Sequence, residues 1–185
     1  MLAAEYFAAE FQGEELCFVV GHRGDFDTYA TMAMSVVKGA LPGIKLWQLI
    51  AYYNPVKPHF TIDEIDETYF PLGLETVPKP YAIVKANNYV VSICDAVICY
   101  VNREGSNTYK LLRKAQRRGI PIVNLAETYP PPENCKTSER KLRGLVILVI
   151  RLHSGRSAGT RLCPRGYSCR HRHPPERRQK PCRFL

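Results

Sequence analysis

The chain has 185 residues, which suits one domain with an extension, and its formal net charge is +9. The charge is unevenly distributed. Residues 1–137 hold 8 Lys and 5 Arg against 15 acidic residues, a formal charge of −2, whereas residues 138–185 carry +11. The basic character therefore belongs to the end of the chain, and we do not expect the remainder to bind nucleic acid.

The sequence predicts no membrane-spanning helix and no secretory signal peptide. No apolar run reaches the roughly 18 residues that a spanning helix needs, and the start lacks the basic segment of a signal peptide. Cys17, Cys94 and Cys99 lie in or beside apolar runs, and the seven cysteines follow no regular disulfide spacing. We therefore expect buried thiols, a cytoplasmic location and no membrane partner.

The first part of the chain alternates helical and strand patterns. A helix is predicted over residues 1–11, a strand over 16–20 and a tight turn over 21–24. The next helix is predicted over 25–38, with a single apolar face formed by Phe26, Tyr29, Ala30, Ala33, Val36 and Val37. A run of β-formers then predicts a strand over 45–52.

Residues 54–80 read as a long connection that holds five prolines and an acidic stretch from Asp63 to Glu67. A connection of that length in a compact domain is often a lid beside a site. The alternative is a solvated insertion with a short helix over residues 62–69. The sequence leaves both interpretations open.

The next part of the chain repeats the alternation. A helix is predicted over 81–93, a strand over 96–101, a helix over 107–118 that ends at Gly119, and a strand over 120–125. The continuous apolar run at 96–101 is typical of a strand that is buried on both faces of a parallel sheet. We therefore predict an α/β fold with a doubly wound parallel sheet and helices on both faces.

The composition changes after Tyr129. We place the domain in residues 1–127, a Pro-rich linker in 128–137 and an Arg-rich tail in 138–185. The tail is poor in large apolar residues, so we expect it to be disordered or non-native. It includes one apolar run, 145–150, that is long enough for a strand.

Two corners, where a strand passes through a glycine-containing loop into a helix, are the main functional signal. They are residues 21–24, and the loop that follows the strand at 96–101. At such corners the free backbone N–H groups and the helix dipole favour an anion. In open α/β sheets, ligands usually bind at these carboxyl ends of the strands.

Each residue of the first corner has two interpretations. Gly21 and Gly24 either approach a ligand or permit a tight turn. His22 and Arg23 either neutralise a phosphate or are exposed turn residues. Asp27 either binds a ribose hydroxyl or stabilises the first helical turn through the dipole, which is the interpretation we prefer.

The second corner offers Gly105, Ser106, Asn107 and Thr108, whose small side chains, hydroxyls and helical N–H groups suit a phosphate or a ribose. The alternative is an ordinary helix cap, since Ser and Asn cap any helix well. Glu104 places a carboxylate where a phosphate would approach. We favour ligand contact for this loop.

Catalytic and metal sites are not predicted. The chain shows no arrangement of a Ser or Cys nucleophile with His and Asp, so we assign no catalytic residue. The Cys and His residues of the tail do not follow the spacing of metal ligands. These residues are Cys163, Cys169, His171, His173 and Cys182.

With both corners placed, the sequence resembles the SLOG superfamily, which includes DNA-processing proteins, lonely-guy phosphoribohydrolases and YpsA-like bacterial proteins. Residues 19–27 are similar to the Gly-x-x-Gly-x-Phe-Asp corner of that superfamily, and 71–79 to its Pro-x-Gly-x-Glu-x-Val-Pro-Lys stretch. Asn87 with 94–101 resembles the helix and strand before the second glycine loop. Residues 122–125 resemble the closing strand.

The resemblance implies a Rossmann-like three-layer α/β/α fold and a nucleotide-derived ligand, such as an ADP-ribose-like compound, held at both corners and near Asn87. No other cofactor is implied. The second glycine pair of the family is here Glu104-Gly105, and no acid follows it, so we predict a sensor or accessory protein rather than an enzyme. Two alternatives remain: N-glycosidic cleavage of a nucleoside monophosphate through Glu104, and nucleic-acid binding through the tail. Formation of a homo-oligomer is left open.

Family members begin with a further central strand that has no counterpart in this sequence. We expect the strands at 16–20 and 96–101 to close up and pair directly, with 145–150 at an outer edge of the sheet or packed loosely. The alternatives are that 145–150 enters the sheet or that the chain is unstable alone.

Overall fold

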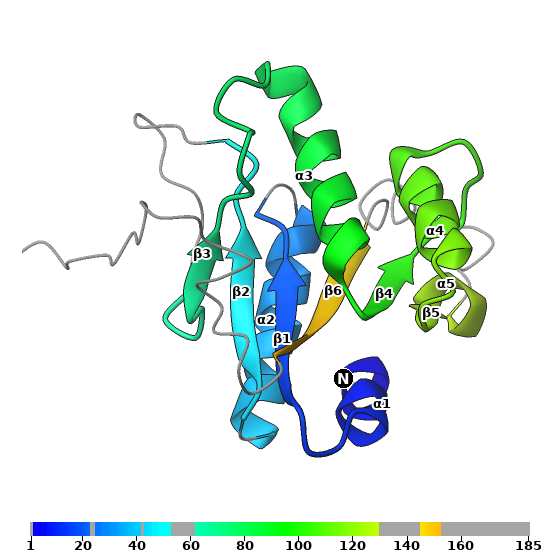
Figure 1. The fold of residues 1–185 in the computed structure, drawn as a ribbon. Helices are drawn as coiled ribbons and strands as arrows, with labels where there is room; N and C mark the ends of the chain where they lie inside the picture. The colour runs from blue at the N-terminus through cyan, green and yellow to red at the C-terminus, as the bar shows by residue number, and fades with distance from the viewer. Residues whose placement is uncertain (1, 23–24, 42, 53–61, 130–144, 153–185) are drawn as a thin grey trace, which may run out of the picture.

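The computed structural model describes residues 2–22, 25–41, 43–52, 62–129 and 145–152 (Figure 1). These residues form an α/β fold, as the sequence predicts. In chain order the elements are α1 (Leu2–Glu10), β1 (Glu15–Val20), α2 (Asp25–Ala40), β2 (Lys45–Leu49), β3 (Glu67–Tyr69), α3 (Lys79–Ile93), β4 (Ala96–Tyr100), α4 (Asn107–Arg117), β5 (Ile122–Asn124), α5 (Leu125–Thr128) and β6 (Leu145–Leu152).

The strands form one six-stranded, mostly parallel sheet in the order β3-β2-β1-β6-β4-β5. The pairs β1–β2, β2–β3 and β4–β5 are parallel. Strand β6 is antiparallel to both of its neighbours, β1 and β4. The five strands of the first part of the chain therefore run in one direction, and β6 crosses the middle of the sheet in the other.

The position of β6 corrects two expectations about the sheet. β1 and β4 do not pair directly, and the run at 145–150 is not at an outer edge. It lies between β1 and β4, with Val149 opposite both Phe18 and Ala96. The physical reason is that this run is apolar on both faces, which suits a central strand and is unfavourable at an exposed edge.

Arg151 fixes the register of β6. Its backbone N–H donates to one oxygen of Asp95 at 2.8 Å, and its guanidinium donates to the other oxygen of Asp95 and to Glu14, both at 3.2 Å. The guanidinium also lies 5.0 Å from the centre of the Phe11 ring. A shift of β6 by one residue would break these contacts and exchange its two faces.

Helices pack against both faces of the sheet. On one face, α3 and α4 bury Ala86, Val90 and Leu111 against alternate residues of the strands. On the other, α1 and α2 bury Phe7 and Met34. Figure 1 shows α3 in front of the sheet and α2 behind it. Among the described residues, no helix has both the length and the apolar character to cross a membrane.

One of the interpretations left open and one local prediction are wrong. The short helix of the solvated-insertion alternative is not present at 62–69. Instead, Glu67–Tyr69 forms the edge strand β3 by pairing with β2, and the Asp66 carboxylate accepts the backbone N–H of Leu46 at 2.8 Å. The apolar face predicted for α2 is only half buried. Ala30 and Val37 are in the core, whereas Tyr29, Ala33 and Val36 are exposed.

Candidate functional site

The carboxyl ends of β1 and β4 lie on the same edge of the sheet, one strand apart. Val19 and Val97 both pair with Leu148 of β6, so β4, which ends at Tyr100, extends two residues further than β1, which ends at Val20. The two strands lie roughly 10 Å apart, because neighbouring strands are about 4.8 Å apart. Strand β6 begins at this edge, where Leu145 pairs with Tyr100.

The loop between β4 and α4 is held at its start by Asn124, the last residue of β5. The side-chain Oδ1 of Asn124 accepts the backbone N–H of Val101 at 2.9 Å, and its Nδ2 donates to the carbonyl of Val101 at 3.1 Å. The same Nδ2 donates to Glu127, and Oδ1 also accepts the N–H of Ala126. One amide thus extends the β4–β5 pairing beyond the strand and caps α5.

The end of the loop is fixed by Ser106, the N-cap of α4. Its hydroxyl oxygen accepts the N–H of Tyr109 at 3.0 Å, and the hydroxyl donates to the carbonyl of Arg103 at 3.1 Å. Gly105 turns the chain with a φ of +79°, in the left-handed region that favours glycine. Ser106 is therefore the helix cap that the sequence offered as its alternative role.

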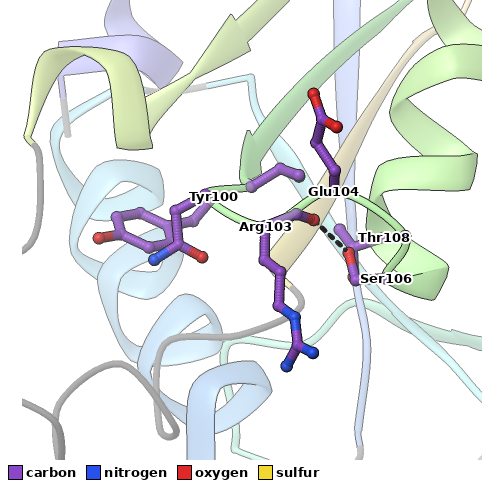
Figure 2. A pocket seen from close by; sticks show the side chains of 8 residues that line it. Tyr100, Arg103, Glu104, Ser106 and Thr108 are labelled. Atoms are coloured by element: carbon purple, nitrogen blue, oxygen red, sulfur yellow. Dashed lines mark hydrogen bonds between the residues drawn. The ribbon is translucent and has the colours of Figure 1, made fainter.

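The loop borders a cavity of about 380 Å³ that is open to solvent. The lining residues all belong to the end of β4, the loop and the first turn of α4: Tyr100, Val101, Asn102, Arg103, Glu104, Gly105, Ser106 and Thr108. Figure 2 shows the side chains of Arg103 and Glu104 pointing to opposite sides of the loop. Both side chains nevertheless line the cavity.

The electrostatics of this cavity favour an anion. The first N–H groups of an α-helix have no carbonyl partner within the helix, and here the Ser106 hydroxyl receives only that of Tyr109. The N–H groups of Asn107 and Thr108 lie at the positive end of the α4 dipole, and no acidic residue occupies the first turn. The Arg103 guanidinium adds a positive charge and the Glu104 carboxylate a negative one, so the preference for an anion comes from the helix N–H groups. The arrangement can hold a phosphate or a carboxylate.

In the first corner, the side chain of His22 contacts β2 and the residues that follow it. The His22 ring lies with Nδ1 2.7 Å from the carbonyl oxygen of Leu49, so Nδ1–H donates to the end of β2. The ring also meets that of Tyr52 edge-on, with centroids 6.4 Å apart, and the Lys79 ammonium lies 5.7 Å from the centre of the Tyr52 ring. His22 therefore points towards β2 and away from the β4–α4 loop.

Gly21 is required by a close approach. A Cβ placed on Gly21 would lie 2.7 Å from the Cγ and from both carboxylate oxygens of Asp27. The Asp27 side chain therefore folds back from the first turn of α2 onto the end of β1. This contact agrees with a structural role for Asp27 at the start of the helix.

We expect Gly21→Ala to destabilise the protein by about 1–2 kcal/mol, because the new methyl group displaces the Asp27 carboxylate. Urea unfolding measures this loss. In an Asp27→Ala background the same substitution should cost little, since the obstruction is gone. Gly39→Ala is the matched control: this helical glycine has open space at its Cβ, so alanine there should stabilise α2 by about 0.5–1 kcal/mol. Equal losses in both backgrounds would contradict the contact.

The structure brings together only part of the predicted site. Glu104, Gly105, Ser106 and Thr108 line the cavity, and Asn107 lies beside them on the exposed side of α4. None of the described residues of the first corner lines it. The predicted ligand residues therefore form two groups: the β4–α4 loop with its cavity, and Gly21, His22 and Asp27 near the end of β1.

Three further candidates fall outside both groups. Asn87 is half-buried in the second half of α3 and does not line the cavity. Arg23 and Gly24 lie outside the described residues. Their proposed ligand contacts remain predictions from the sequence.

Sequence reasoning missed three residues of this site. Asn102 and Arg103 line the cavity, and Asn124 positions the loop. Arg103 could have been noticed, because it is a cation directly before a Glu-Gly turn. Asn124 gave no local signal, because its role depends on a partner 23 residues earlier in the chain.

The described cysteines are neither reactive thiols nor part of a metal site among the described residues. Cys17, Cys94 and Cys99 are free and buried, as predicted. Burial raises the pKa of Cys94 to about 11 and that of Cys99 to about 12, so both stay protonated at neutral pH. Within the described residues, no three His, Cys, Asp or Glu side chains gather into a metal site. The Cys and His residues of the tail lie outside that part of the chain.

No protein-family model, no curated protein and no solved structure matches this chain.

Proposed function

We propose that this chain is a Rossmann-like, SLOG-like domain that binds a phosphate-bearing nucleotide or nucleotide derivative and acts as a sensor or accessory protein. The observation that carries the proposal is the cavity of about 380 Å³ at the β4–α4 loop. Its size lies within the range of small-molecule sites. Its donors are the N–H groups of the α4 first turn and the Arg103 guanidinium.

The phosphate would lie at Gly105–Thr108, and the ribose and base would extend from the cavity towards the end of β1. The Ser106 hydroxyl is engaged as the helix cap. We therefore assign phosphate binding to the backbone N–H groups and to Arg103, and not to that hydroxyl.

We expect Gly105→Asp to weaken the binding of AMP or ADP-ribose at least tenfold, because it places a negative charge and bulk beside the phosphate. Glu104→Gly and Glu104→Gln should strengthen binding severalfold by removing a like charge. Isothermal titration calorimetry measures both effects.

Two controls separate charge from backbone strain. Gly105→Asn has nearly the shape of the aspartate variant without its charge, so it should retain more affinity than Gly105→Asp. Gly73→Asp introduces aspartate at a similar φ, +76°, on a loop that does not line the cavity, and should leave binding unchanged. If Gly105→Asp and Glu104→Gly both bound like the parent protein, the phosphate would not be at this loop.

The same samples test the enzymatic alternative. Glu104 is the acidic residue that lines the cavity, and it would have to assist cleavage of the N-glycosidic bond. Under the proposed function, AMP stays intact during prolonged incubation, as measured by chromatography. Release of free adenine by the parent protein but not by Glu104→Gln would replace the sensor proposal with that of a phosphoribohydrolase.

A further inference from the structure

Six large apolar side chains remain exposed on the face of the molecule that carries α1 and α2. They are between 49% and 70% exposed. They come from α1, from α2 and from the residue after α5, and together they are called the α1–α2 patch: Leu2, Tyr6, Tyr29, Met32, Val36 and Tyr129. Surface patches of this kind usually mark sites of interaction.

Helix α2 is the centre of the patch. A different face of this helix buries Ala30, Met34 and Val37 in the core. Tyr29, Met32 and Val36 follow one another at intervals of three and four residues and therefore form one exposed stripe. The small residues along this stripe, Ala33, Gly39 and Ala40, are exposed too, and none of its described residues is charged. Helix α2 therefore has an exposed apolar stripe in addition to the apolar face that it buries.

The patch has a concave part beside this convex stripe. A groove of about 480 Å³ runs between α1, α2 and α5. Leu2, Tyr29 and Tyr129 form its exposed rim, and Ile98 and Ile147 of the sheet lie at its base. A ridge and a groove on the same surface meet the requirement for a self-complementary interface across a two-fold axis.

We propose that the α1–α2 patch is the interface of a homodimer, in which the α2 helices of two copies pack antiparallel. The six side chains, each about half exposed and about 200 Å² in full, offer on the order of 700 Å² of apolar surface. A standard stable interface uses about 800 Å² per partner. The patch therefore offers most of the surface that one partner of such an interface needs, and its lack of charge along α2 is typical of homodimer interfaces.

The symmetry predicts which residues meet. A two-fold axis that passes between Met32 and Ala33 sets Met32 against the partner's Ala33 and Tyr29 against the partner's Val36. Each of these pairs sets a longer side chain against a shorter one, as ridges-into-grooves packing requires. The register can therefore be tested by introducing opposite charges at positions 29 and 36.

The test is sedimentation equilibrium of the full chain and two variants, Tyr29→Glu and Val36→Lys. The parent protein should sediment as a dimer, and each variant alone should be a monomer, because each places charges against an apolar partner surface. An equimolar mixture of the two should recover the dimer. In the mixed dimer, the glutamate at position 29 of one copy contacts the lysine at position 36 of the other copy. The symmetry-related contact is then between the unaltered Val36 of the first copy and the unaltered Tyr29 of the second.

Val84→Lys is the matched control, because Val84 is an exposed valine on α3, on the other face of the sheet. It should leave the dimer intact. All variants should retain the thermal midpoint of a folded protein, since every substituted side chain is exposed. A monomeric parent protein would overturn the proposal and leave the patch to another occupant, such as another part of the chain. Dimers that persist in both single variants would show that the interface lies elsewhere.

Discussion

Replacing Val149 with aspartate is expected to prevent the protein from folding. Val149 is fully buried at the centre of the sheet, between Phe18 of β1 and Ala96 of β4. Its carbonyl also accepts the N–H of Asp95 at 2.8 Å. An unpaired carboxylate at this point costs several kcal/mol, a large part of the stability of a small domain. Circular dichroism and urea unfolding report the loss.

Two further variants make this expectation specific to the position of β6. Val149→Ala leaves a small cavity and should cost about 2 kcal/mol while keeping a cooperative transition. Val84→Asp makes the same change as Val149→Asp on the surface of α3 and should stay within about 0.5 kcal/mol of the parent. Cooperative unfolding of Val149→Asp at the parent's urea midpoint would contradict the placement of β6 in the core.

Replacing Asn124 with alanine is expected to lower both stability and ligand affinity. The substitution leaves the N–H and carbonyl of Val101 without their partners, and Val101 is a mostly buried residue at the start of the β4–α4 loop. Losing these bonds should cost about 2–3 kcal/mol. Because the loop then loses its anchor, AMP binding should weaken about tenfold, as measured by titration under conditions where the variant remains folded.

The controls for this prediction distinguish positioning from general destabilisation. Asn124→Asp keeps the acceptor for the Val101 N–H but loses the donor, so its losses should be intermediate. Asn88→Ala removes the contacts of Lys114 to the Asn88 side chain between α3 and α4, remote from the loop. It should lower stability without changing affinity. If Asn124→Ala bound AMP as tightly as the parent, Asn124 would not position the site.

The sequence was a good guide to elements with strong local patterns. Helices α2, α3 and α4 have clear apolar periodicity, and the buried strands β1 and β4 are continuous apolar runs, so both kinds were predicted near their observed bounds. Strand β3 was not predicted, because its three residues are a strand only through pairing with β2. The apolar run of β6 predicts a strand, but the neighbours with which it pairs are more than 40 residues away, so its place in the sheet was left open between the alternatives.

The candidate site divides in the same way. Gly105 and Ser106 were predicted from local chemistry, since a left-handed glycine and a helix cap are local requirements. The cap has the geometry expected of it, whereas the ligand contacts of this loop remain a prediction. Asn124 was missed because it acts across the sheet. The exposed side of α2 was misassigned, because apolar periodicity gives no sign of whether a face is covered by the same chain.

Nuclear magnetic resonance shows whether the first turn of α4 and Arg103 hold the phosphate of a nucleotide. The ¹⁵N-labelled full chain is titrated with AMP and, separately, with adenosine, which lacks the phosphate. We expect AMP to shift the amide signals of Arg103, Gly105, Asn107 and Thr108, and adenosine to leave these four signals nearly unchanged. Saturating AMP that leaves these amides in place, or that shifts only signals elsewhere in the protein, would contradict this expectation.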